Sequence, residues 1–154
     1  MALRILVDGD DPILRKKSRD ITAFDGRLHQ LLDDMHHTMT ASEGVGLAAV
    51  QVGILRRAIV IDIDRRIELI NPVILEQSNE TVEEGEACLS FPGESGMVPR
   101  AKWVKVRAQD RFGNKFTLDA EDLLARAIFH EIDHLEGVVY KDRAVRMLKP
   151  GEEG

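Results

Sequence analysis

Hydrophobic residues recur at helical spacing in two parts of the chain. In the first part they predict an amphipathic helix at about residues 26–41, with Asp25 placed to cap its start. The second predicted helix starts near Asp119, carries acidic residues in its first turn, and ends at Gly137. Each helix has one apolar side, which another layer of structure must cover.

Shorter runs of β-branched residues lie between these helices and predict antiparallel strands. The runs are separated by charged, Asn-Pro or polar turns and occupy residues 58–63, 67–70 and 73–76. Residues 103–109 then alternate between apolar and polar positions, as a half-buried strand does. A turn at 111–114 leads into residues 115–118, which completes a predicted hairpin.

Small residues and proline interrupt this pattern. The apolar stretch 44–53 contains several glycines and alanines, so its backbone can approach a ligand closely. The stretch 85–99 is rich in glycine and proline and is predicted to be a loop; it contains Cys88, the chain's single cysteine. Only a short tail is expected after residue 140, and residues 149–154 are predicted to be flexible.

Composition indicates one globular domain at residues 1–148. The chain has 154 residues, 44% of them hydrophobic, and no apolar run approaches the roughly 20 residues of a membrane span. The N-terminal segment turns acidic at Asp8, too early for a signal peptide, which predicts a cytoplasmic protein. A lone cysteine suits such a reducing compartment. The formal charge of −6 disfavours direct nucleic-acid binding.

The strongest chemical signal is His130-Glu131-Ile132-Asp133-His134, on the second predicted helix. Histidines four positions apart project from the same face and can share one metal ion, while Glu131 reaches a water bound to that ion. Leu123 and Ala127 fall on the same stripe, and Arg126 is assigned with Asp133 to the solvated side, with its aliphatic stem able to rim the pocket beside that stripe. The alternative interpretation is an exposed polar helix that binds no metal and has no catalytic role.

A catalytic metal site of this type needs a third protein ligand. A further histidine downstream is excluded, because Tyr140 occupies its position. A downstream glutamate is also disfavoured, since only Glu152 and Glu153 remain there. The ligand is therefore expected upstream, where Cys88 is the strongest candidate because a thiolate binds divalent metals well. The alternative for Cys88 is a small buried apolar side chain.

Three segments together resemble the peptide deformylase family. Residues 44–51 (GVGLAAVQ) resemble G-x-G-L-A-A-x-Q, residues 86–90 (EACLS) resemble E-G-C-L-S, and residues 130–134 (HEIDH) resemble H-E-x-D-H. The resemblance implies an α+β fold of small antiparallel sheets packed around a central HExxH helix. Ala87 departs from the motif, which has glycine there; a methyl group would disturb a position that needs positive φ or close backbone approach.

For the metal site, the resemblance implies that Cys88, His130 and His134 bind one divalent ion. It implies Fe²⁺ as the native metal, with Ni²⁺, Co²⁺ or Zn²⁺ replacing it in preparations. Glu131 would take a proton from the attacking water and pass it to the leaving amine. Glu86, inside the second motif, is expected to anchor the cysteine segment through a basic partner, whereas the neighbouring Glu83 and Glu84 are expected at a solvated edge.

For the substrate, the resemblance implies that the Gln51 side-chain amide and the Leu89 backbone N–H face the oxyanion. The alternative for Gln51 is a loop residue that bonds its own main chain. Gly46 would bind the peptide backbone, with the peptide added as a strand beside residues 44–47. Three residues are expected to wall a pocket for methionine: Val45, Leu123 and Ala127.

The implied activity is removal of the formyl group from the initiator methionine, with the nascent N-formyl-methionyl polypeptide as the partner. A bacterial cytoplasm is expected, and a processed organellar form stays open. The chain lacks the added C-terminal helix of longer members, so proximity to the ribosome is not expected to use that route. The rival hypotheses are a metallopeptidase or amidase acting on another acyl group, and a non-enzymatic metal-binding homologue, against which the intact Glu131 argues.

Overall fold

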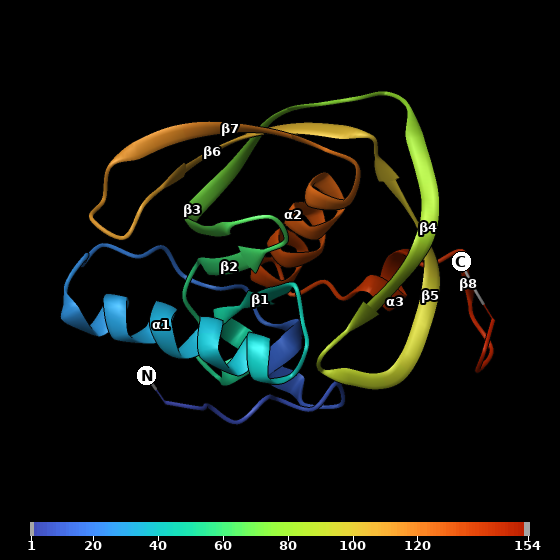
Figure 1. Ribbon diagram of the computed structural model, residues 1–154, viewed down its shortest axis with the longest axis horizontal. Coiled ribbons are helices and arrows are strands. Elements are labelled where there is room, and N and C mark those ends of the chain that lie inside the picture. Colours follow the sequence, from blue (N-terminus) through green and yellow to red (C-terminus); the bar gives the residue numbers. More distant parts are fainter. Residues whose placement is uncertain (1, 153–154) are drawn as a thin grey trace.

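The protein folds into two antiparallel sheets around a central helix, as the computed structural model shows for residues 2–152 (Figure 1). One sheet has five strands in the order β1-β2-β3-β6-β7, and the other has three in the order β4-β5-β8. Helix α2 contacts strands of both sheets, and α1 covers β1 and β2 from the other side. This is the α+β arrangement that the sequence predicts.

The helices hold most of the largest buried side chains. Their bounds are η1 (Pro12–Arg15, 3-10), α1 (Gly26–Ala41), η2 (Ala49–Val52, 3-10), α2 (Asp122–Leu135) and α3 (Tyr140–Arg143). The predicted first helix is confirmed, and Asp25 caps it by accepting hydrogen bonds from the backbone N–H groups of Arg27 and Leu28. Leu32, Met35 and Met39 on its apolar side are fully buried.

The strands confirm part of the predicted pattern. Their bounds are β1 (Gly46–Ala48), β2 (Ala58–Asp62), β3 (Arg66–Gln77), β4 (Thr81–Cys88), β5 (Phe91–Ala101), β6 (Trp103–Gln109), β7 (Lys115–Glu121) and β8 (Arg146–Met147). The hairpin of β6 and β7 is where the alternation places it, with Val106 paired to Leu118 on the buried side. The apolar stretch after α1 contains β1 and η2.

Two boundaries differ from prediction because strand pairing continues where a break was expected. The second helix begins at Asp122, since β7 stays paired with β6 as far as Glu121 opposite Trp103. The two runs at 67–70 and 73–76 belong to one strand, β3. Asn71 takes a positive φ of 51° there, and the pairing shifts beside it, so the Asn-Pro pair makes a bulge and not a turn.

The prediction of a loop at 85–99 is wrong, because most of these residues belong to the β4–β5 hairpin. Pro99 pairs with Glu83 on one side, while β8 reaches β5 only at Gly96 and Met97. Within residues 2–152, no strand pairs with Pro99 on the side that faces away from β4. The missing N–H of this proline therefore breaks no sheet hydrogen bond on that side. Cys88 consequently lies at the end of a strand.

The chain beyond α2 forms a short helix and a short strand where only a tail was predicted. Gly137 follows the helix with a φ of 76°, and a β-carbon there would lie 2.5 Å from the carbonyl oxygen of Arg15. α3 and β8 come next, and Lys149 N–H then donates to Glu152 in a turn. Residues 153 and 154 lie outside the described residues, so the flexible tail at 149–154 stays a prediction.

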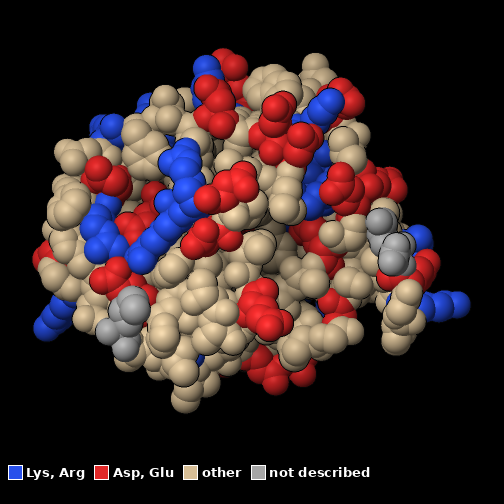
Figure 2. Space-filling view, viewed as in Figure 1, with Lys and Arg blue, Asp and Glu red and all other residues tan. Residues whose placement is uncertain are grey.

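The surface carries both signs of charge. Figure 2 shows acidic and basic side chains interleaved over one face, including the region where the β6–β7 turn lies near α1 in Figure 1. In that region the backbone oxygen of Arg111 is 2.9 Å from Nε2 of His29 on α1.

Among residues 2–152, none of the helices combines the length and apolarity that crossing a bilayer requires.

Candidate active site

Cys88, His130 and His134 form a cluster of possible metal ligands. One donor atom from each lies within 4.8 Å of the others, and no second cluster of this kind occurs in the described part of the chain. Cys88 Sγ is 3.4 Å from His134 Nε2. The cysteine comes from the end of β4 and both histidines from α2, so the packing of α2 against the β4–β5 hairpin assembles the site.

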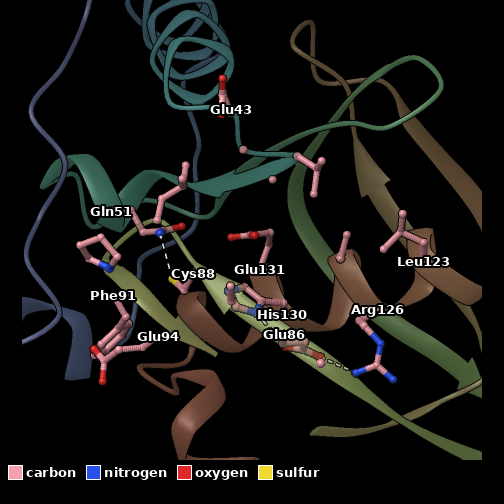
Figure 3. A pocket seen from close by; sticks show the side chains of 18 of the residues that line it. Glu43, Gln51, Glu86, Cys88, Phe91, Glu94, Leu123, Arg126, His130 and Glu131 are labelled. Carbon is pink, nitrogen blue, oxygen red and sulfur yellow. Dashed lines mark hydrogen bonds and ion pairs between the residues drawn. The ribbon is translucent and has the colours of Figure 1, made fainter. Parts of the chain in front are cut away.

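Glu86 orients the first histidine. His130 Nδ1 donates to Glu86 Oε1 at 2.9 Å, and both side chains are buried. A carboxylate on Nδ1 holds a histidine in the tautomer whose Nε2 is available to a metal. Figure 3 shows Glu86 beneath His130, with Cys88 beside the ring.

The surroundings of the two histidines favour opposite charge states. Burial alone would lower the pKa of His130, but Glu131, Cys88 and Glu86 outweigh it and raise the pKa to about 10. Burial, with positive His130 and Arg100 nearby, lowers the pKa of His134 to about 3, so this ring stays neutral. A thiol, two imidazoles and nearby carboxylates suit a divalent transition metal, so the donor set fits.

Glu131 lies beside the cluster without a partner for one oxygen. It is 4% exposed, and Oε1 has no hydrogen-bond partner among the described residues. Burial raises its pKa to about 7. Gly46 on β1 leaves room for this carboxylate, because a β-carbon there would lie 2.7 Å from Glu131 Oε2. In Figure 3 the Glu131 side chain reaches from α2 toward β1.

Gln51 is held so that its amide nitrogen points at the cysteine. Its Oε1 accepts from Ala48 N–H at 3.0 Å, while Nε2 donates to Cys88 Sγ at 3.4 Å and to Ser90 Oγ at 3.2 Å. The side chain therefore does bond its own main chain, as the alternative reading held. The same bond directs its nitrogen into the site.

One cavity of about 450 Å³ borders the site and is lined by every predicted site residue except His134, which is fully buried. Leu123 and Arg126 lie toward one end and Phe91 and Glu94 toward the other, with Glu131 between them (Figure 3). β1 is the outermost strand of its sheet, so one of its edges is unpaired within that sheet. The predicted residues that line the cavity are Val45, Gly46, Gln51, Cys88, Leu89, Leu123, Ala127, His130 and Glu131.

Two arginines of the site differ from the sequence predictions. Arg126 was assigned to solvent but is 6% exposed and donates to Glu86 Oε2 at 2.7 Å. Arg100 was not identified; it donates to Glu86 through two nitrogens and to Asp133, whose side chain is also largely buried. The position of Arg126, four residues before His130 and thus only about 40° away around the helix, was the signal that could have found it.

These arginines are the basic partners expected for Glu86. Burial opposes its ionisation, but hydrogen bonds from His130 and Arg100 outweigh it and lower its pKa to about 2. Glu83 and Glu84 are exposed, as expected. Among the described non-glycine residues, positive φ occurs only at Glu43, Asn71 and Asp122, so Ala87 is not strained. Its exposed side chain lies between two buried neighbours in the strand.

Comparison with known proteins decides the family. A sequence model of the family described as polypeptide deformylase matches residues 3–149. The chain belongs to the polypeptide deformylase family. The peptide deformylase of Caldicellulosiruptor bescii is 54% identical to it over 153 residues, which are 99% of this chain and 92% of that protein. Peptide deformylase 1 of Bacillus cereus is 47% identical over 155 residues, with 99% of each chain covered.

Solved deformylase structures share the fold. The peptide deformylase of Thermotoga maritima superposes with a TM-score of 0.92 at 39% identity, covering 94% of this chain and 99% of that one. The enzyme of Synechococcus elongatus, in complex with actinonin, gives a TM-score of 0.90 at 39% identity over 92% and 78% of the two chains. The expected deformylase-like α+β fold is confirmed, and the chain is a hydrolase of this metal-dependent family.

Proposed function

We propose that this deformylase removes the formyl group from the N-terminal methionine of newly made polypeptides and releases formate. The observation that carries the proposal is the convergence of Cys88, His130 and His134 within 4.8 Å, with the unpartnered Glu131 carboxylate beside them. This arrangement occurs in a chain of the deformylase family. The proposed setting is a bacterial cytoplasm, with the nascent polypeptide as the partner.

Cys88, His130 and His134 would hold one divalent ion, with Fe²⁺ as the native metal and Ni²⁺, Co²⁺ or Zn²⁺ as substitutes. When bound there, such an ion supplies Lewis-acid chemistry: it lowers the pKa of water and polarises a carbonyl oxygen. The proposal is supported by the orientation of His130 through Glu86 and by the neutral state of His134.

Glu131 would act as the proton shuttle. Its carboxylate takes the proton of the attacking water and then donates it to the nitrogen of methionine as the C–N bond breaks. A pKa of about 7, raised by burial, lets one side chain hold and release a proton near neutral pH. The absence of a partner for Oε1 among the described residues leaves an oxygen to receive that proton.

Gln51 and Leu89 would stabilise the oxyanion formed from the formyl group. The bond from Ala48 to Gln51 Oε1 fixes which end of the amide faces Cys88, so Nε2 is the group presented to the cavity. Leu89 directly follows the cysteine and lines the same cavity. It lies in the turn between β4, which ends at Cys88, and β5, which begins at Phe91.

The substrate peptide would lie along the unpaired edge of β1, where Gly46 accepts close backbone approach. Val45, Leu123 and Ala127 would wall the pocket for the methionine side chain. All three line the cavity, and Leu123 lies on the side of Glu131 away from Phe91 and Glu94 (Figure 3). The rival enzymatic function is hydrolysis of a different acyl group or of an internal peptide bond at the same site.

Substrate comparison separates these functions. Protein prepared without oxygen and loaded with Fe²⁺ or Ni²⁺ is given formyl-Met, acetyl-Met and unblocked Met versions of one tripeptide. The proposal predicts stoichiometric formate from the first and little or no hydrolysis of the others. Cleavage of an internal peptide bond without formate release would contradict it and favour the metallopeptidase.

A further inference from the structure

Arg126 joins the helix that carries both histidines to the hairpin that carries the cysteine. Its Nη1 donates to Glu86 Oε2 at 2.7 Å and to Val98 O at 2.8 Å, and its Nη2 donates to Val82 O at 2.7 Å. Val82 and Glu86 belong to β4 and Val98 to β5. One buried side chain of α2 is thus bonded to both strands of the hairpin.

The same side chain is linked to His130 through one carboxylate. Glu86 Oε2 accepts from Arg126, while Oε1 of that carboxylate accepts from His130 Nδ1 at 2.9 Å. Arg126 and His130 lie one helical turn apart on α2. Glu86 in turn lies two residues before Cys88 on β4, so the link connects the two sources of ligands.

Arg126 also borders the substrate cavity, unlike the second arginine on Glu86. Arg126 is among the cavity-lining residues and lies at the end where Leu123 is found (Figure 3), whereas Arg100 does not line the cavity. Because Nη1 and Nη2 bond Glu86 and two backbone carbonyls, and Nε lies 3.8 Å from Glu84 Oε2, Arg126 keeps little freedom to move. Its place next to the pocket is therefore fixed by the same bonds that orient Glu86.

We propose that Arg126 is a positioning residue, which sets the placement of Cys88 relative to His130 and His134 by bonding α2 to the β4–β5 hairpin and holding Glu86 on His130. This inference rests on the proposed metal site. Lysine in its place would keep the charge but could not make the planar, multiple hydrogen bonds of a guanidinium. Methionine would keep most of the volume and lose every one of these bonds.

The test measures Co²⁺ binding in Arg126→Met and Arg126→Lys, with Arg143→Met as the matched control. Arg143 is half exposed and pairs with Asp133, with no bond to Glu86. Metal affinity is measured by competition with a chelator, and ligand geometry by the visible absorption of bound Co²⁺. Urea unfolding of the metal-free proteins measures stability separately.

Arg126→Met is expected to weaken Co²⁺ binding roughly ten- to a hundredfold and to change the Co²⁺ spectrum, as loss of groups that orient ligands does. Arg126→Lys should restore only part of the affinity, and Arg143→Met should stay within about twofold. If Arg126→Met does not fold, Arg126→Lys decides alone. Wild-type affinity and spectrum in a folded Arg126 variant would overturn the proposal and leave Arg126 a merely structural residue.

The two proposals fail in distinguishable ways. If the wild-type protein binds Co²⁺ through the cysteine and histidines but releases no formate, the proposed function fails while the positioning role of Arg126 remains testable. If formate release is normal in the wild type and the Arg126 variants keep wild-type metal affinity, the positioning role alone fails.

Discussion

Oxygen Oε2 of Glu131 lies close to the α-carbon of Gly46. A β-carbon built on Gly46 would be 2.7 Å from that oxygen and 3.3 Å from the carboxyl carbon. Real side chains do not approach so closely, so the glycine on β1 provides the space in which the proposed proton shuttle lies. Because the obstructed group is the end of a flexible side chain, a larger residue would displace the carboxylate without disrupting β1.

Replacement of this glycine should therefore separate activity from folding. Gly46→Ala is expected to lower kcat by about a hundredfold or more, the usual contribution of a well-placed general base, while the melting temperature stays near that of the wild type. Gly26→Ala is the matched control, since a β-carbon at Gly26 meets nothing within 4 Å. Wild-type kcat in Gly46→Ala would show that the position of Glu131 does not limit the reaction.

Ala87 should tolerate a return to the glycine of the family motif. Because its φ is not positive and its side chain is exposed, the methyl group causes no strain. Ala87→Gly is expected to keep metal binding and to cost about 0.5–1 kcal/mol in the free energy of unfolding, from the added freedom of the unfolded chain. Urea denaturation measures this cost. A gain in stability together with tighter metal binding would mean that the methyl group does distort the cysteine strand.

The pH dependence of stability should report the ion pairs around Glu68. Burial opposes ionisation of Glu68, but Arg111 and Arg66 outweigh it and lower its pKa below 4.5. A lowered pKa in the folded state stabilises the protein above about pH 4.5, and this stabilisation is lost as the pH falls. Glu68→Gln should thus cost about 1 kcal/mol at pH 7 and progressively less below pH 4.5.

Urea unfolding of the metal-free proteins across this pH range measures the difference. Glu76→Gln is the control, because Glu76 is exposed and forms no ion pair within residues 2–152. A cost of Glu68→Gln that stays constant between pH 7 and pH 3.5 would contradict the ion-pair explanation.

Local patterns in the sequence predicted the parts of this site that depend on local structure. The spacing of His130 and His134 places both on one helix face, and both lie on α2, which begins at Asp122 and not near Asp119. α1 and the β6–β7 hairpin were likewise predictable, since each is determined by repeats within a short segment. Cys88 was reached by excluding the downstream ligands, without knowledge of how its strand packs.

The parts that failed depend on pairing and packing that local composition does not reveal. The Gly- and Pro-rich segment around Cys88 forms strands because β4 and β5 pair with each other, which composition alone disfavours. Arg126 is buried because Glu86, forty positions earlier, lies against it. The helical position of Arg126 beside His130 indicates the site, but its burial and its bond to Glu86 follow only from the tertiary structure.

In the proposed mechanism, Cys88 holds the metal while Glu131 moves the proton. This assignment is tested most directly by measuring metal content and formate release together in Cys88→Ala and Glu131→Gln after anaerobic loading with Ni²⁺. Glu131→Gln should bind one ion per chain and lose about a hundredfold or more in kcat, whereas Cys88→Ala should lose both the ion and the activity. Full metal content and wild-type formate release in Cys88→Ala would contradict the account.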